Sequence, residues 1–154
     1  MRRLGPLLII GCVLGLDHWS KHAAERIFGG VATVVPGLFS LRLVYNRGML
    51  FSLGEGPDGG IGALLIWLLW TAAVGLLCLL AARTPAKKPM RLAGFACMIG
   101  GALSNGLDRA LDGRVTDFLQ LGPLPILNVA DVAFLIGAAL VITDVMRAPA
   151  HRSR

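Results

Sequence analysis

The sequence predicts an α-helical polytopic membrane protein, with four transmembrane helices and a small extracytoplasmic β-cradle between the first and second helices. Two observations lead to this fold class. The first is composition: 55% of the 154 residues are hydrophobic and 16% are charged, whereas soluble domains carry about 25% charged residues. The second is that the charged residues gather in short clusters between long apolar segments. The length predicts one domain, covering residues 1–154.

Four segments are apolar enough to cross a membrane, which takes about 20 mainly apolar residues. They cover approximately residues 4–24, 61–82, 92–108 and 129–146. The second is the clearest, because it holds no charged residue over 22 positions. The third and fourth are short, which favours helices that pack against protein around a site. The N-terminus has basic residues followed by an apolar stretch, as a signal peptide does. An uncleaved first transmembrane helix is the simpler interpretation, because the rest of the chain is itself predicted to span the membrane several times.

The positions of lysine and arginine predict the orientation, because cytoplasmic loops carry an excess of these residues. Nine of the 15 basic residues lie at the two termini and in the connection 83–91. Both termini are therefore expected in the cytoplasm, with segments 25–60 and 110–128 outside. The formal net charge of +6 does not indicate nucleic-acid binding, since the basic residues do not line one solvated face.

Segment 25–60 is predicted to be rich in β-structure. Apolar and polar side chains alternate along 39–46, which is typical of a strand, and 31–35 can pair with it through a turn at Pro36 and Gly37. A small sheet beside a site could hold an extended peptide by edge pairing. The alternative is an ordered connector that only covers the helix ends.

Two aspartates, Asp117 and Asp131, lie at the edges of apolar segments. An ionised carboxylate there is costly, and it is retained where it has a charged or polar partner, a water-lined cavity or a catalytic role. Two carboxylates held close together share one proton, as in the aspartic peptidases. The ionised one takes a proton from water and the protonated one polarises a carbonyl. Polar neighbours at helical spacing could hold them, namely Asn105, Asp108, Arg109 and Asn128. The alternative is structural, with both carboxylates solvated or capping helix ends.

Other chemistries have weaker support. Ser20 and Lys21 are adjacent, and side chains at i and i+1 of a helix do not face each other. His18 and His22 have a spacing that zinc could use, but the glutamate of the H-E-x-x-H motif is absent and the third histidine lies in the tail. Asp17 and Lys21, at i and i+4, are expected to form an interfacial pair. No metal or cofactor is therefore predicted.

Four groups of residues, taken together, resemble the motifs of lipoprotein signal peptidase (signal peptidase II). Residues 17–21 resemble the family's D-x-x-[ST]-K motif, and residues 46–51 resemble its N-x-G-x-A-F motif. Residues 100–118 are similar to its G-G-x-x-G-N-x-x-D-R and G-x-V-x-D-F blocks, and residues 127–131 are similar to F-N-x-A-D. The motifs follow the family order across essentially the whole chain, which makes the resemblance specific.

The resemblance implies a four-helix aspartic endopeptidase of the bacterial inner membrane, with a periplasmic β-cradle and a site near the outer face. It implies removal of the signal peptide from diacylglyceryl-modified prolipoproteins by cleavage just before the lipidated Cys. By motif position, Asp117 and Asp131 are the catalytic pair. The supporting or substrate-binding residues are Asp17, Lys21, Asn46, Gly48, Asn105, Asp108, Arg109 and Asn128. The implied partners are the lipid bilayer and the lipidated substrate, with the chain expected to act as a monomer.

The chain departs from the family at Ser104, Leu50 and Leu127, where the family usually has Gly, Ala and Phe. These changes affect helix packing and the walls around the site. They are expected to affect substrate fit and rate more than the chemistry, since every polar motif residue is present. Two alternatives stay open: a divergent homologue that binds lipoproteins without turnover, and a small proton- or ion-coupled carrier that uses the same carboxylates as relays. The carrier would favour two similar halves, and the sequence shows no convincing internal repeat.

Overall fold

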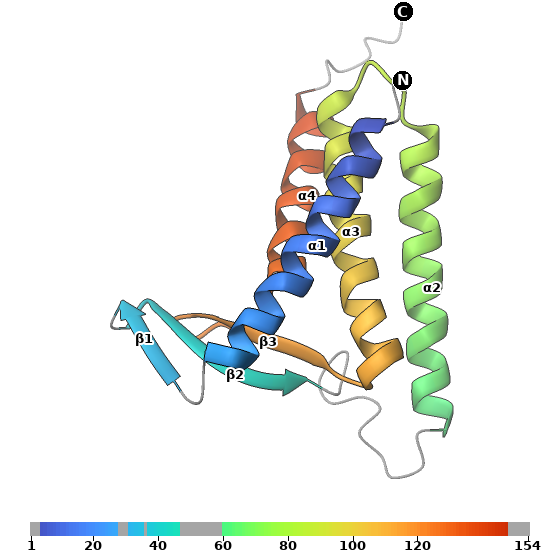
Figure 1. Ribbon diagram of the computed structural model, residues 1–154. Coiled ribbons are helices and arrows are strands. Elements are labelled where there is room, and N and C mark those ends of the chain that lie inside the picture. The colour runs from blue at the N-terminus through green and yellow to red at the C-terminus, as the bar shows by residue number, and fades with distance from the viewer. Residues whose placement is uncertain (1–3, 28–30, 36, 47–59, 148–154) are drawn as a thin grey trace, which may run out of the picture.

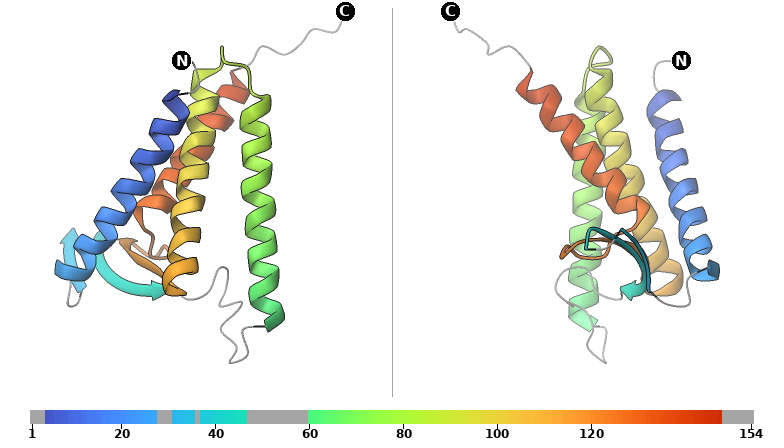
Figure 2. Two further views of the ribbon diagram at one scale, coloured as in Figure 1. Left: turned by 45° about the vertical axis from the view of Figure 1, so that its right-hand side comes forward. Right: turned by 90° about the vertical axis from the view of Figure 1, so that its left-hand side faces the viewer.

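The computed structural model describes residues 4–27, 31–35, 37–46 and 60–147. Four helices run alongside one another, and a small sheet lies across one end of them (Figures 1 and 2). The opposite end gathers the start of α1 (Leu4–Ile27), the connection between α2 (Gly60–Arg83) and α3 (Pro89–Asp112), and the end of α4 (Val129–Met146). The four predicted helical segments are therefore helices.

Two of these helices extend at least three residues beyond their predicted spans. α1 continues to Ile27, and α3 covers 24 residues rather than the span 92–108. α3 starts at Pro89 because a proline fits the first helical turn, where its missing N–H costs nothing. It ends at Gly113, whose φ of 67° gives the left-handed conformation that favours glycine. The charged end of α3 continues the helix because Asp108 pairs with Lys21 of α1 instead of facing lipid.

Two of the described helices are long and apolar enough to cross a membrane by length and composition alone: Leu64–Arg83 of α2 and Val129–Met146 of α4. α1 and α3 have lower hydropathy because they carry polar and charged side chains toward the sheet end. At 24 residues each, both are about 36 Å long, which exceeds the roughly 30 Å of a hydrocarbon core. The prediction of four spans is thus supported by composition for two helices.

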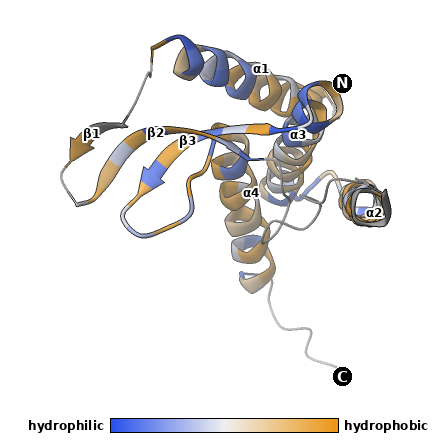
Figure 3. Ribbon diagram, turned by 90° about the horizontal axis from the view of Figure 1, so that it is seen from below, coloured by the Kyte–Doolittle hydropathy of each residue, from blue (hydrophilic) through white to orange (hydrophobic). Residues whose placement is uncertain are grey.

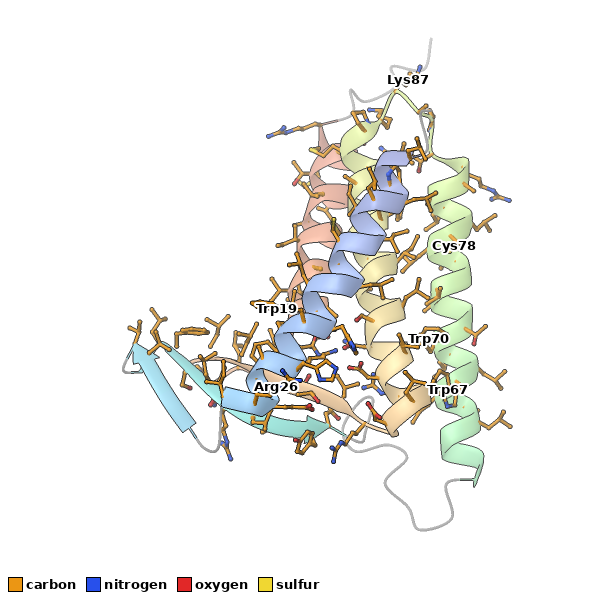
Figure 4. The ribbon with its side chains drawn as sticks, in the orientation of Figure 1. Trp19, Arg26, Trp67, Trp70, Cys78 and Lys87 are labelled. Atoms are coloured by element: carbon orange, nitrogen blue, oxygen red, sulfur yellow. The ribbon has the colours of Figure 1, made fainter. Side chains whose placement is uncertain are left out.

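α2 stands at the edge of the bundle and is apolar around its whole circumference (Figure 3). No residue of its apolar window is buried. An apolar surface this extensive is stable against lipid and not against water. α2 is attached to α3 by Trp70, which extends toward α3 (Figure 4) and donates a hydrogen bond of 3.0 Å to the carbonyl oxygen of Ala102. The Trp70 ring covers Gly106, where a Cβ would collide with it.

The sheet has three antiparallel strands in the order β1 (Val31–Val35), β2 (Phe39–Asn46), β3 (Val115–Leu121). The predicted pairing of 31–35 with 39–46 is confirmed, and Gly37 adopts a φ of 73° in the turn between them. The third strand was not predicted, and it corrects the expectation of a sheet built only between the first and second helices. It comes from the connection between α3 and α4, and it places Asp117 opposite Val44.

α3 and α4 approach closely because small residues line their contact. A Cβ built on Gly94 would lie 2.7 Å from the carbonyl oxygen of Gly137, and a Cβ on Gly101 would collide with the carbonyl oxygen of Ala130. Ala130 is fully buried one residue before Asp131. The close approach therefore sets the position of the start of α4, where the polar site lies.

Gly101→Ala is expected to lower the free energy of unfolding by about 1–3 kcal/mol, the usual effect of adding a methyl group to a filled core. The added Cβ meets backbone at Ala130, which cannot rotate away as a side chain can. Thermal unfolding in detergent measures the change. Gly75→Ala on α2 is the matched control, because nothing lies within 4 Å of its Cβ. Equal midpoints for the two variants would contradict the packing argument.

Candidate active site

Polar side chains from five elements meet at the sheet end of the bundle. α1 supplies Asp17 and Lys21, β2 supplies Asn46, and β3 supplies Asp117. The remaining members come from α3 and from the start of α4: Asn105, Asp108, Arg109, Asn128 and Asp131. All nine are among the residues predicted from the sequence. The tenth, Gly48, lies outside the described residues, as do Leu50 and most of its motif.

Asp117 is buried in β3, at 4% exposure, and both of its carboxylate oxygens accept hydrogen bonds from amides. Asn128 donates to Oδ1 over 2.7 Å and Asn46 donates to Oδ2 over 3.1 Å. Asn46 reaches it diagonally across the sheet, because Asn46 pairs with Val115, two residues before Asp117 on the same face. The strand pairing thus places one carboxylate between two side-chain donors.

Burial raises the pKa of Asp117 to about 6, because the site removes water from the ionised form. The negative charge of Asp131 raises the pKa further, whereas the hydrogen bonds from Asn46 and Asn128 and the charge of Lys21 lower it. The effect of Asp131 indicates that the two carboxylates lie within electrostatic range of each other. A carboxyl group with this pKa changes between its proton-donating and proton-accepting forms near neutral pH.

This raised pKa predicts how stability depends on pH. The folded protein binds a proton at Asp117 more tightly than the unfolded chain, whose ordinary pKa is 3.8. The stabilisation from this proton is therefore complete below about pH 3.8 and is lost as pH rises through about 6. Relative to Asp117→Asn, the wild-type thermal midpoint is expected to fall between pH 4 and pH 7. A difference between the two proteins that does not change with pH would contradict the assignment.

Asp131 lies in the first turn of α4, where it forms a capping box with Asn128. The Asn128 backbone N–H donates to Oδ2 of Asp131 over 3.2 Å, and the Asp131 backbone N–H donates to Oδ1 of Asn128 over 2.9 Å. Asn105 of α3 donates to the other carboxylate oxygen, Oδ1, over 2.8 Å. The reciprocal bonds fix the direction of both side chains at the helix start.

Asn128 connects the two aspartates. Its Nδ2 donates to Asp117 and also, over 3.0 Å, to Oδ1 of Asn105, which in turn binds Asp131. Its own side chain is completely buried. Asn128 therefore bonds both carboxylates, Asp117 through its side chain and Asp131 through its backbone N–H, so the two aspartates lie on one hydrogen-bond network.

Lys21 is the buried cation of the network. Its Nζ lies 2.5 Å from Asp17 Oδ2 and 2.6 Å from Asp108 Oδ2, and it donates to Asn105 Oδ1 over 2.9 Å. Lys21 is 4% exposed and Asp17 is 0% exposed. Asp17 and Lys21 thus form the predicted i, i+4 pair, but the pair is buried and not interfacial, because both side chains point into the bundle, where Lys21 also pairs with Asp108. Asp108 pairs with Lys21 across the contact between α3 and α1.

Arg109 faces the same network from the last turns of α3. It donates to the backbone carbonyl oxygen of Asn105 over 3.2 Å. The carboxylates of Asp117, Asp131 and Asp108 lie within electrostatic range of its guanidinium group. Arg109 is thus placed to balance the negative charge of the aspartate pair.

Sequence reasoning missed two contacts around the site. Ser104, where the resembled family usually has Gly, donates to Asp17 Oδ2 over 2.7 Å. Thr116, next to Asp117, donates to Glu25 Oε1 over 2.8 Å and ties β3 to the end of α1. The partners are 87 and 91 residues apart, so no local spacing could reveal them. Ser20 precedes Lys21 in the sequence, and its hydroxyl donates to the backbone carbonyl oxygen of Asp17.

The chain matches the family model described as signal peptidase (SPase) II over residues 9–147. It is similar to the lipoprotein signal peptidase of Mesorhizobium japonicum, with 36% identity over 151 residues that cover 94% of this chain and 87% of the relative. It is also similar to that of Paraburkholderia phymatum, with 37% identity over 94% and 89% of the two chains. The lipoprotein signal peptidase of Synechocystis is 38% identical, over 82% of this chain and 78% of the relative.

Two solved structures of bacterial membrane enzymes share the fold. One has a TM-score of 0.82 at 20% identity and covers 99% of this chain and 93% of its own. The other has a TM-score of 0.80 at 21% identity and covers 95% of each chain. These structures support the helical bundle with its small sheet, and the family match and the relatives extend over the segments that build the carboxylate network. This chain belongs to the signal peptidase II family.

Proposed function

We propose that this chain is an aspartic endopeptidase of the inner membrane that cleaves diacylglyceryl-modified prolipoproteins just before the lipidated Cys. Family membership makes it a peptidase that removes signal peptides from prolipoproteins. The aspartic chemistry rests on one observation: Asn128 holds both carboxylates, donating its side-chain Nδ2 to Asp117 and its backbone N–H to Asp131. The carrier and the non-catalytic homologue are not favoured, since the relatives are peptidases.

In the proposed reaction the two carboxyl groups share one proton. The ionised group removes a proton from water, whose oxygen attacks the scissile carbonyl carbon, while the protonated group donates to the carbonyl oxygen. The intermediate collapses when the C–N bond breaks and the amine leaves with a proton from the carboxyl pair. Asn128 and Asn105 hold the carboxylates, and Arg109 offsets the negative charge that develops on the oxyanion.

The membrane setting supports four spanning helices with the site toward the outer face. Asp17 and Lys21 are satisfied inside the bundle, so α1 can cross lipid despite its charges. The end remote from the sheet carries the basic Arg83, Lys87 and Arg147, as expected of a cytoplasmic face. β3, which carries Asp117, is an edge strand of the sheet, so an extended substrate can pair with the part of β3 that is not already bonded to Leu127. Because one chain supplies every member of the network, a monomer suffices.

The test is cleavage by the purified protein in detergent or nanodiscs. A diacylglyceryl-modified prolipoprotein and its unlipidated form are incubated separately, and mass spectrometry identifies the products. We expect release of the signal peptide from the lipidated substrate alone, with the new N-terminus at the modified Cys. Equal cleavage of the unlipidated form would contradict lipid recognition, and cleavage of neither form would contradict the peptidase assignment.

A further inference from the structure

Two histidines on α1 face each other outside the carboxylate network. His18 and His22 are both exposed, and their Nε2 atoms lie 3.1 Å apart. The rings are nearly perpendicular, with an interplanar angle of 82° and centroids 4.4 Å apart. The i, i+4 spacing places them one turn apart on a single helix face. They lie at the sheet end of α1, where the neighbouring Trp19 and Arg26 are labelled in Figure 4.

The separation of these two nitrogens suits a shared metal ion. Imidazole nitrogen binds Zn²⁺ at about 2.0–2.1 Å. An ion at about 2.05 Å from both Nε2 atoms would make an N–metal–N angle of about 98° across the observed 3.1 Å. That angle lies between the right angle of neighbouring ligands in square-planar or octahedral sites and the wider tetrahedral angle. The backbone of α1 would not need to move to hold the ion.

A carboxylate behind His22 adds an independent feature of metal sites. Histidine ligands commonly donate their second ring N–H to a carboxylate, which fixes the tautomer and the ring. Glu25 Oε2 lies 3.8 Å from His22 Nδ1, which is longer than a hydrogen bond, so a small side-chain movement would make it that acceptor once Nε2 carries a metal and Nδ1 carries the proton. The other oxygen of Glu25 already binds Thr116. This bond keeps the carboxylate on the side of α1 that carries His22.

We propose that His18 and His22 bind one divalent transition-metal ion through their Nε2 atoms, with Glu25 as the outer partner of His22. Water completes the coordination, since the described part of the chain has no group of three or more His, Cys, Asp or Glu side chains arranged around a metal. Two imidazoles select borderline ions, and Cu²⁺ is expected to bind more tightly than Zn²⁺ or Ni²⁺. The site is separate from the aspartate pair and does not depend on the proposed peptidase chemistry.

The test is direct metal binding by the full-length protein without an affinity tag. Calorimetric titration with CuCl₂ and ZnCl₂ measures stoichiometry and Kd, and electron paramagnetic resonance of the Cu²⁺ form counts nitrogen ligands. We expect one equivalent of Cu²⁺ with two nitrogens. His18→Gln and His22→Gln are each expected to weaken binding at least tenfold, and Glu25→Gln by about tenfold. His151→Gln, which removes the tail histidine, is the matched control and is expected to change nothing.

His18, His22 and Glu25 are exposed, so substituting them is expected to change metal binding without unfolding the protein. Binding that survives both His18→Gln and His22→Gln would overturn the proposal, as would a Cu²⁺ spectrum with one nitrogen. Absence of binding in a wild-type sample that cleaves substrate would also overturn it. Unchanged thermal midpoints of the variants exclude misfolding as the cause of lost binding.

Discussion

Asp131→Asn is expected to reduce cleavage of a lipidated prolipoprotein at least about 1,000-fold, with Asp117→Asn having a similar effect, because each removes the proton transfer on which the mechanism depends. Asparagine keeps the shape and an accepting oxygen for Asn105, which donates to Asp131 Oδ1 over 2.8 Å. It cannot take a proton from water. Single-turnover cleavage of the lipidated substrate, followed by mass spectrometry, measures the rate.

Asp112→Asn is the matched control, because Asp112 is exposed at the end of α3 and the substitution makes the same chemical change. It is expected to retain full activity. Wild-type rates in either purified Asp117→Asn or Asp131→Asn would rule out the aspartate pair. A folded Asp131→Asn protein that still binds the lipidated substrate would locate the defect in the chemical step.

Lys21→Met is expected to lower the free energy of unfolding by roughly 3 kcal/mol, the usual result of leaving a buried charge without its partner. Lys21 contacts Asp17, Asp108 and Asn105, and Asp17 has no exposure to water. For a chain of this size the thermal midpoint should fall by roughly 6–12 °C. Scanning calorimetry or a thermal-shift measurement in detergent gives the midpoint.

Lys87→Met removes the same charge from an exposed position between α2 and α3 and is expected to leave the midpoint unchanged. The double variant Asp17→Asn/Lys21→Met removes the most deeply buried partner as well, and it should recover part of the loss. A double variant no more stable than Lys21→Met would contradict the explanation by an uncompensated charge.

Local patterns in the sequence predicted the parts of the fold that depend on local spacing. The alternation along 39–46 predicted β2, and the spacing of Asn128 and Asp131 placed them together, as the capping box now does. β3 was missed because Val115 to Phe118 are all buried, so the strand shows no alternation between a wet and a dry face. The residues around Asp117 were identified only as a motif, but they also form β3, and the pairing of β3 with β2 positions the Asp117 carboxylate.

The environment of the α1 charges depends on contacts that local spacing does not encode. The i, i+4 spacing correctly paired Asp17 with Lys21 but could not tell an interfacial pair from a buried one. The buried pair is stabilised by two distant groups. Asp108, 87 residues from Lys21, accepts a hydrogen bond from it, and the backbone N–H of Ala130, 113 residues from Asp17, donates to the Asp17 carboxylate. The resemblance to signal peptidase II named these residues without indicating what they touch.

The origin of the network in five elements has a consequence for how the protein is made. Asp117 and Asp131 lie in β3 and α4, the last two elements of the described chain, and both depend on Asn128 just before α4. A nascent chain that has inserted only α1, α2 and α3 holds Lys21 and Asp108 but neither member of the aspartate pair. The proposed aspartate pair is therefore complete only after the final helix has been made and inserted.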